Sequence, residues 1–351
     1  MKAVSIEDLH PGMTLARTIV NDNMIVVLSE NTVLTKAHIT RLGFLNIPAV
    51  YVKDDFELTT TPVVGEPLTR SHAFIAEYKE VVSEVQDIFG SVATGSEVPV
   101  ERTTAMVQRD LAPMSKQSGA IDYLYELNHL ASDVYNHSLR VSILAGVIAK
   151  WMRIPKTHDI IMAGFMHDIG KTKFSERLLE KNVQTLKGED LEMYRNHARD
   201  GFNILSANKD VSEGVRLAAL QHHERMDGSG FPSGLTGKDI HEYARIIAVA
   251  DIYDNITTER EGYVKQTPFS AIAQISEDMF SKLDPAVCMP FLNNIKHVFL
   301  GSTVTLSNGL QGILVGYPED FAANPLIRIT QDQVVDLNEH KNIKIIEYNP
   351  K

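Results

Sequence analysis

The feature that most constrains the fold of this chain is a series of helical patterns between residues 118 and 297. Apolar residues recur there at intervals of three and four, the spacing that places them on one face of an α-helix. The clearest segments are HLASDVYNHSLRVSILAGVIAKWM, DIIMAGFMHDIG, EDLEMYRNHARDGFNIL, VRLAALQHH and YARIIAVADIYDNITT. We therefore predict an all-α domain over residues 118–297, built as a helical bundle.

Shorter elements flank this region. In residues 1–60, the β-rich runs TLARTIV, MIVVL and PAVYV surround TKAHITRLGFL, a predicted helix with Thr35 as its N-cap and Gly43 near its end. After the helical region, GSTVTLSNGLQGILVGYP alternates and turns at Asn308-Gly309, a strong hairpin signal, and LIRIT and NIKIIEY follow. The chain is therefore predicted to be multidomain, with a small N-terminal α/β module and a small C-terminal β module.

The boundaries between these parts follow from changes in composition and hydrophobic pattern along the sequence. A linker, TTTPVVGEPLT, precedes two helical patches that are separated by GSVATGSEVP. The predicted organisation is an N-terminal α/β accessory or regulatory domain, a helical connector, the helical domain and the β module, over residues 1–70, 71–117, 118–297 and 298–351. The terminal modules show no phosphate loop, redox motif or basic patch, so a regulatory or dimerising role is the default expectation for them.

Composition excludes several classes of function. The net charge of −11 in 351 residues argues against a nucleic-acid polymer as partner, although bound metal ions could still attract an anionic substrate. The single cysteine, Cys288, cannot form an intramolecular disulfide and suggests a reducing compartment. The N-terminus lacks a signal-peptide pattern, and no stretch has the roughly 18 apolar residues of a membrane span. We expect a cytoplasmic protein.

Histidine and aspartate residues recur along the predicted helical region. Most single histidines in a protein are hydrogen-bonded core or surface residues, and we assign His10, His38, His72 and His340 to that class. Asp251, in contrast, has core-type neighbours in RIIAVADIYD, where an unpaired carboxylate would cost several kcal/mol. A bundle core is a known place for metal sites. Metal binding is therefore predicted for the ordered set His137, His167, Asp168, His197, His222, His223 and Asp251.

Residues 118–297, about half of the chain, resemble an HD-GYP domain, the branch of the HD phosphohydrolase superfamily associated with hydrolysis of cyclic dinucleotides. The general HD pattern is matched by His137 in NHSLRV, His167-Asp168 in HDIGK and Asp251 in AVADIYD. The branch-specific pattern is matched by HARDGFNIL around His197 and by HHERMDGSGFP. The resemblance implies an HD-type helical bundle, in a bacterial arrangement with an accessory domain before it.

The resemblance also implies that the seven residues of the ordered set are metal ligands. Nitrogen and carboxylate ligands without thiolate favour iron or manganese. Two ions about 3.5–4 Å apart can activate water and neutralise phosphoryl oxygens, and each oxygen of Asp168 could take one ion. Some family members add a glutamate one helical turn before the first histidine. Asp133 stands at that place, on the expected face of His137, and is the candidate ligand for a third ion.

Substrate contacts follow from the same resemblance. Lys171, three residues after Asp168, matches a lysine that contacts a phosphate, and we assign Asp168 and Lys171 to catalysis. Arg260 matches an arginine whose guanidinium fork suits phosphate oxygens. The chain departs from the family pattern after this arginine, in REGYVK, where Lys265 is the candidate for the cation that normally follows.

The turn DGSGFP is expected to form a substrate-facing lip. Asp227 and Gly228 would shape the turn, and Gly230 would let the backbone approach a ligand closely. Phe231-Pro232 stands where the family usually has Tyr-Pro, which keeps an aromatic face but loses the hydroxyl. Near the paired histidines, the helix VRLAALQHH is expected to unwind and turn both rings towards one cluster.

These features predict a metal-dependent phosphodiesterase with two or three divalent ions, iron or manganese, that opens cyclic di-GMP to linear pGpG and then to GMP in bacterial second-messenger signalling. One alternative keeps the metals but takes 3′,3′-cyclic GMP-AMP or another nucleotide phosphoester. A second alternative is a non-catalytic cyclic-dinucleotide sensor or interaction module. A homodimer and diguanylate cyclase-type signalling proteins complete the expected partners.

Overall fold

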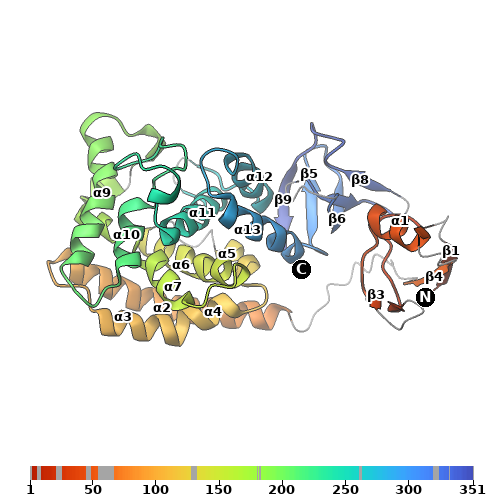
Figure 1. Cartoon of the computed structure of the whole chain (residues 1–351), viewed down its shortest axis with the longest axis horizontal. Coiled ribbons are helices and arrows are strands. Elements are labelled where there is room, and N and C mark those ends of the chain that lie inside the picture. The colour runs from red at the N-terminus through yellow and green to blue at the C-terminus, as the bar shows by residue number, and fades with distance from the viewer. Residues whose placement is uncertain are drawn as a thin grey trace. The chain divides into compact units, whose positions relative to one another are not determined.

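The computed structural model of the chain describes residues 2–5, 9–20, 26–44, 49–53, 67–127, 133–179, 181, 183–260, 263–318, 324–331 and 333–350. The chain divides into two compact units, a helical one over Glu66–Val298 and one formed by Met1–Gly65 together with Phe299–Lys351 (Figure 1). The predicted fold class is confirmed, because a helical core is combined with a small N-terminal α/β module and a small C-terminal β module. The predicted linker TTTPVVGEPLT lies largely outside the described residues.

Where the structure describes it, the helical unit contains α-helices of very different lengths, joined by short 3-10 turns and a π-helical stretch. They are α2 (Pro67–Ala93), α3 (Val100–Met106), the π-helix η2 (Val107–Leu111), α4 (Ala112–Lys116), α5 (Ala120–Leu127), α6 (Val134–Trp151), α7 (Thr157–Met166), η3 (Ile169–Lys173), α8 (Glu176–Leu179), η4 (Val183–Thr185), α9 (Gly188–Ser206), α10 (Glu213–Gln221), η5 (Gly237–Asp239), α11 (Glu242–Thr257), α12 (Pro268–Asp278) and α13 (Pro285–Val298).

Helices α6 and α7 form the closely packed centre of this unit. Helix α6 is apolar on almost every side and is buried along most of its length, as expected for a central helix. Gly164 lets α7 approach α6, since a Cβ there would lie 2.8 Å from the Cα of Ser142. This contact holds the C-terminal end of α7, where His167 and Asp168 follow, against the helix that carries His137.

Helix α2 also belongs to this unit and packs against α6, η3 and α5. Its apolar residues follow helical spacing, and the exposed fraction of each is 5% or less at Phe74, Tyr78, Val81, Val85, Ile88 and Phe89. The Phe89 ring lies 5.5 Å from that of Phe165 on α7. The expectation of a separate connector over residues 71–117 is therefore corrected, because α2 needs the helical core to bury this face.

In its described residues, the N-terminal module contains two antiparallel strand pairs and one helix. Strand β1 (Lys2–Ser5) pairs with β4 (Ala49–Val52), and β2 (Ile19–Val20) pairs with β3 (Val26–Leu28). Helix α1 (Lys36–Phe44) begins after Thr35, whose Oγ1 accepts a hydrogen bond from the backbone N–H of His38 at 3.2 Å. Thr35 is thus the N-cap, as predicted.

The C-terminal module is an antiparallel sheet with the strand order β8-β7-β6-β5-β9. The strands are β5 (Thr303–Leu306), β6 (Gln311–Gly316), β7 (Leu326–Arg328), β8 (Val334–Asp336) and β9 (Ile345–Asn349). The hairpin between β5 and β6 turns at Asn308-Gly309, where Gly309 has a φ of +85°, so this prediction is confirmed. Strands β1 and β8 were not predicted. Among the described residues, no helix has both the length and the apolar character to cross a membrane.

Candidate metal centre

The predicted ligands converge from helices that are far apart in the sequence. His137 lies on α6, His197 on α9 and Asp251 on α11. His167 and Asp168 directly follow α7, and His222 and His223 directly follow α10. Helix α10 ends at Gln221 and His222 is its C-cap, so the paired histidines do leave the helix where the sequence indicated.

A first group of ligand atoms surrounds the Nε2 atom of His137. This atom lies 3.2 Å from Nε2 of His167 and 3.2 Å from Oδ1 of Asp251. Oδ2 of Asp168 lies 3.5 Å from Nε2 of His137 and 3.4 Å from Nε2 of His167. An imidazole pair and two carboxylates therefore face one small volume.

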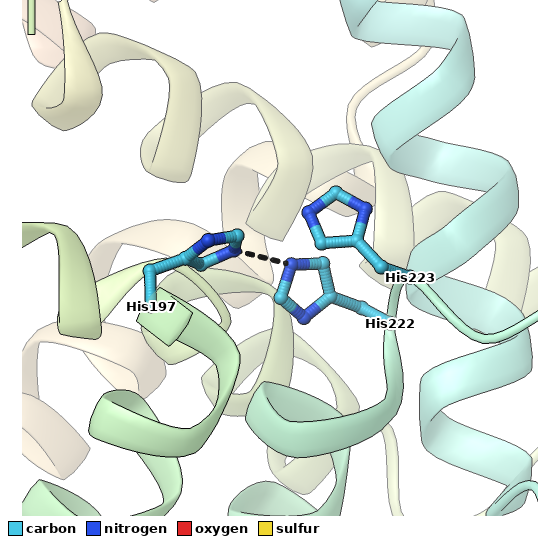
Figure 2. Close-up of side chains that lie close together, drawn as sticks. All are labelled: His197, His222 and His223. Atoms are coloured by element: carbon cyan, nitrogen blue, oxygen red, sulfur yellow. Dashed lines mark hydrogen bonds between the residues drawn. The ribbon is translucent and has the colours of Figure 1, made fainter. Parts of the chain in front are cut away.

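A second group contains His197, His222 and His223, whose rings converge in Figure 2. Nε2 of His197 lies 3.2 Å from Nε2 of His222, the contact that is dashed in the figure. Oδ1 of Asp168 lies 3.2 Å from Nε2 of His197 and 3.7 Å from Nε2 of His222. Each oxygen of Asp168 therefore faces a different group, which is the arrangement of a carboxylate shared by two ions.

The hydrogen bonds of the imidazoles show that this cluster suits metal ions. A neutral imidazole has one N–H and one lone pair. The Nδ1 atom of His167 donates to the carbonyl oxygen of Gly164 (2.6 Å), and that of His222 donates to the carbonyl oxygen of Ala219 (2.9 Å). The Nδ1 atom of His197 donates to the carbonyl oxygen of Tyr194, and that of His137 donates to Oδ2 of Asp254 (2.8 Å). The Nε2 lone pairs consequently face each other at 3.2 Å, which is repulsive unless a cation lies between them. Oδ1 of Asp168 and Nε2 of His223 are likewise buried without a hydrogen-bond partner among the described residues.

Burial and charge keep most ligands in the form that binds metals. Burial lowers the pKa of His167 below its usual value, and it lowers the pKa values of His222 and His223 well below it. Burial alone would raise the pKa of Asp168, but the Lys171 ammonium and the neighbouring imidazoles hold this pKa well below the usual range. The rings of His167, His222 and His223 are therefore neutral and the Asp168 carboxylate is ionised, as metal coordination requires.

A buried ion pair supports the first group from behind. Asp254 accepts hydrogen bonds from Nδ1 of His137 and from Nε of Arg140, the latter at 2.7 Å. Burial alone would raise the pKa of Asp254, but Arg140 and His137 lower it strongly, so the carboxylate stays charged. Sequence reasoning missed both residues. The signal was available, because Asp254 and Arg140 each follow a predicted ligand by three residues and so share its helix face.

A cavity of about 430 Å³ opens beside the cluster. Asp168, His137, His223 and Asp251 contribute to its wall together with cationic, polar and aromatic side chains, among them Lys171, Lys181, Tyr194, Asn255 and Arg260. Sequence reasoning identified Lys171 and Arg260 but missed Lys181, Tyr194 and Asn255. The cavity thus combines ligand atoms with cations that suit an anionic group.

Lys171 and Arg260 are held in place by other polar residues of the cavity. Lys171 donates to Oδ2 of Asp168, and its Nζ lies 5.5 Å from the centre of the Tyr194 ring. Asn255 donates to Oδ1 of Asp251 at 2.7 Å, and its backbone oxygen accepts from Arg260 at 2.9 Å. Asn255 therefore connects a predicted metal ligand to a predicted phosphate contact.

Two predicted site residues make contacts that the sequence did not indicate. Asp133 is the N-cap of α6, where Oδ1 accepts from the backbone N–H of Asn136 at 2.8 Å. Its carbonyl oxygen accepts a hydrogen bond from the backbone N–H of His137 at 3.0 Å, so Asp133 lies one turn before His137, and both residues line the cavity. Lys265 lies with its Nζ 4.4 Å from the centre of the Tyr125 ring and is not among the described residues that line the cavity.

The turn DGSGFP folds over its own backbone. Oδ1 of Asp227 accepts hydrogen bonds from the backbone N–H and the hydroxyl of Ser229. A Cβ at Gly230 would lie 2.4 Å from both Cα of Glu224 and the carbonyl oxygen of His223. The close approach at Gly230 is therefore to the chain itself. Of the described residues that line the cavity, none belongs to the predicted turn set Asp227, Gly230, Phe231 and Pro232.

Comparison with known proteins agrees with this geometry. A family model described as HD domain matches residues 125–287. The chain is 27% identical over 278 residues to cyclic di-GMP phosphodiesterase PA4108 of Pseudomonas aeruginosa. The matched region covers 76% of this chain and 67% of that protein. It is 32% identical over 151 residues to 3'3'-cGAMP-specific phosphodiesterase 3 of Vibrio cholerae, covering 42% of this chain and 32% of that protein.

A solved structure shares the fold. Bd1817, a HDG"Y"P protein from Bdellovibrio bacteriovorus, superposes with a TM-score of 0.52 at 16% sequence identity, covering 84% of this chain and 99% of that one. Together with the family match over residues 125–287, this fold and the order of the His and Asp motifs confirm the resemblance drawn from the sequence. The region over residues 125–287 therefore matches the HD domain family.

Proposed function

We propose that this protein is a metal-dependent phosphodiesterase that hydrolyses a cyclic dinucleotide, with cyclic di-GMP as the first candidate substrate and linear pGpG, then GMP, as products. The observation that carries the proposal is Asp168, whose two oxygens face different imidazole pairs, Oδ2 those of His137 and His167 and Oδ1 those of His197 and His222. A pair of ions sharing a carboxylate suits an in-line displacement at a phosphate. The names of the curated relatives support the substrate class.

The ligand set fits divalent ions. One ion would be held by His137, His167 and Asp251 and the other by His197, His222 and His223, with Asp168 shared between them. Nitrogen and oxygen donors without thiolate favour iron or manganese. When bound, such ions would supply Lewis-acid charge for the phosphoryl oxygens and for a water nucleophile. A third ion beside Asp133 stays a prediction.

The other side chains of the cavity would bind and orient the substrate. The Lys171 ammonium and the Arg260 guanidinium line the same wall and suit the non-bridging oxygens of a phosphodiester. Asn255 holds Arg260 at a set distance from Asp251. Burial raises the pKa of Tyr194 to about 12, so its Oη keeps a proton at neutral pH and can donate to an oxygen of the substrate.

A second candidate substrate is 3′,3′-cyclic GMP-AMP. The similarity to a Vibrio cholerae phosphodiesterase named for that substrate favours it. Both molecules present the same phosphodiester ring to the cations of the cavity, so they differ only in what contacts one base. The non-catalytic sensor, the homodimer and the diguanylate cyclase-type partners stay predictions.

The proposal is tested by purifying the full chain without oxygen, loading it with Fe²⁺ or Mn²⁺, and measuring turnover of cyclic di-GMP, 3′,3′-cyclic GMP-AMP and a linear dinucleotide. Asp168→Asn keeps the shape of the side chain but removes the shared charge. We expect it to lower turnover by about 10²–10³-fold, the usual scale for losing one electrostatic contribution to a transition state.

The matched control is Asp87→Asn, because Asp87 is 68% exposed on α2 and far in sequence from the cluster. This control should keep wild-type turnover and metal content. If the metal-loaded wild type binds a cyclic dinucleotide but hydrolyses none of the panel, the sensor function replaces the enzyme. If Asp168→Asn turns over at the wild-type rate, the assignment of the centre is wrong.

A further inference from the structure

His223 differs from the other four imidazoles of the cluster in how it is held. Each of the others donates a hydrogen bond from Nδ1, and this bond sets the rotation of the ring (His137, His167, His197 and His222). Within the described part of the chain, neither ring nitrogen of His223 has a hydrogen-bond partner, and its Nε2 is buried. Something other than a hydrogen bond must therefore orient this ring.

The ring of Phe231 lies flat against that of His223. Their centres are 4.4 Å apart and their planes differ by 24°. The other close rings meet His223 at steeper angles, 45° for His222 and 88° for His197. Phe231 is thus the neighbour that limits rotation of the His223 imidazole out of its plane, since a stacked ring leaves no room for such a turn.

The position of Phe231 is itself set by contacts of the turn. Its backbone N–H donates to the carbonyl oxygen of His223 at 3.2 Å. The carboxylate of Glu224, 2% exposed, accepts from the backbone N–H groups of Ser233 (2.7 Å) and Leu235 (3.0 Å), which holds the chain after the turn. The guanidinium carbon of Arg195 lies 5.6 Å from the centre of the Phe231 ring.

We propose that Phe231 is a positioning residue for the metal centre, whose stacked ring aims Nε2 of His223 at the ion shared with His197 and His222. This inference rests on the proposed metal site. It assigns the aromatic position of the DGSGFP turn to ligand orientation, and Phe231 is not among the described residues that line the substrate cavity. Because stacking needs only the ring, tyrosine at this position would serve equally.

The test measures metal binding directly. The full chain is stripped of metal, and Mn²⁺ binding is followed by titration calorimetry and by metal analysis of the dialysed protein, for the wild type and for Phe231→Leu, Phe231→Tyr and Phe280→Leu. Phe280, 83% exposed, is the matched control. We expect Phe231→Leu to weaken the binding of one of the two ions by about 10-fold or more, the scale for losing a group that orients a ligand. Phe231→Tyr and Phe280→Leu should match the wild type.

Two results would overturn the inference. If Phe231→Leu binds both ions as the wild type does, with or without a higher KM for the dinucleotide, Phe231 does not position His223. If Phe231→Tyr is as defective as Phe231→Leu, ring stacking is not the cause. A wild type that binds fewer than two ions contradicts the proposed centre itself. Phe231→Met, also without a ring, replaces Phe231→Leu if that variant does not fold.

Discussion

At the scale of single residues, the centre depends on a glycine as much as on its ligands. Gly170 follows His167 and Asp168 on η3, where the chain passes directly over α9. A Cβ at this position would lie 2.0 Å from the carbonyl oxygen of His197 and 2.6 Å from the backbone nitrogen of Gly201. Both atoms belong to the backbone of a long helix, so neither can move aside without displacing His197.

We therefore expect Gly170→Ala to destabilise the helical unit by about 3 kcal/mol, at the upper end of overpacking costs, and to weaken metal binding. The matched control is Gly90→Ala on α2, where no atom other than those of its chain neighbours and its own helix backbone lies within 4 Å of the added Cβ. That change should stabilise the chain by about 0.5–1 kcal/mol, because alanine loses less backbone entropy than glycine in a helix. Urea unfolding measures both, and a similar effect of the two variants would contradict this account.

At the scale of elements, an ion-pair cluster joins α2 to the helical stretch that follows it. The carboxylate of Glu84 on α2 pairs with Arg102 on α3 at 3.1 Å and with Arg109 on η2 at 2.7 Å. Burial alone would raise the pKa of Glu84, but its hydrogen bonds to Arg109 and Arg102 hold this pKa below the usual value. The folded state thus binds a proton at Glu84 less readily than the unfolded state does.

Glu84→Gln should lower the free energy of unfolding by about 0.5–1 kcal/mol at neutral pH, the usual scale for an exposed ion pair. The sign follows from the lowered pKa, because the ion pair stabilises the fold above the unfolded-state pKa and stops doing so as pH falls through the folded-state pKa. Wild type and variant should therefore converge in acid. Urea unfolding between neutral and acid pH checks this, with Glu80→Gln, exposed on the same helix, as control. If the difference in the free energy of unfolding between wild type and Glu84→Gln grew in acid, this explanation would be wrong.

At the scale of the whole molecule, the metal centre links helices from distant parts of the chain. Its predicted ligands run from His137 on α6 to Asp251 on α11, and all of them belong to the unit over Glu66–Val298. An ion that binds the folded cluster but not the unfolded chain stabilises this unit by mass action. The unit that carries the strands contributes none of these ligands.

Removal of the ions with a chelator should lower the melting temperature of the helical unit by about 5–10 °C, if ions are supplied at about a hundred times their Kd. Trp151, the single tryptophan, ends α6 and makes fluorescence a probe of this unit alone. Asp168→Asn should reduce the shift, because it removes a shared ligand. A Trp151 transition that is unaffected by chelation would be evidence against a metal that supports the fold.

Local patterns explain which parts were predictable. The cap at Thr35, the turn at Asn308-Gly309 and the end of α10 before His222 depend on neighbours within a few residues, and each was predicted correctly. The role expected for Lys265 was less accurate, because the direction of a side chain in a loop depends on what packs against it. Lys265 lies over the ring of Tyr125, which is 140 positions earlier in the sequence.

The sequence by itself determined the helical bundle, the imidazole and carboxylate residues of the candidate metal centre, and the order in which they occur, because helical spacing and side-chain chemistry are local properties. Only the tertiary structure decided which oxygen of Asp168 faces which imidazoles, that Asp254 supports His137 across 117 positions, and that Phe231 stacks on His223. These relations depend on side-chain directions, and packing between distant segments sets those directions.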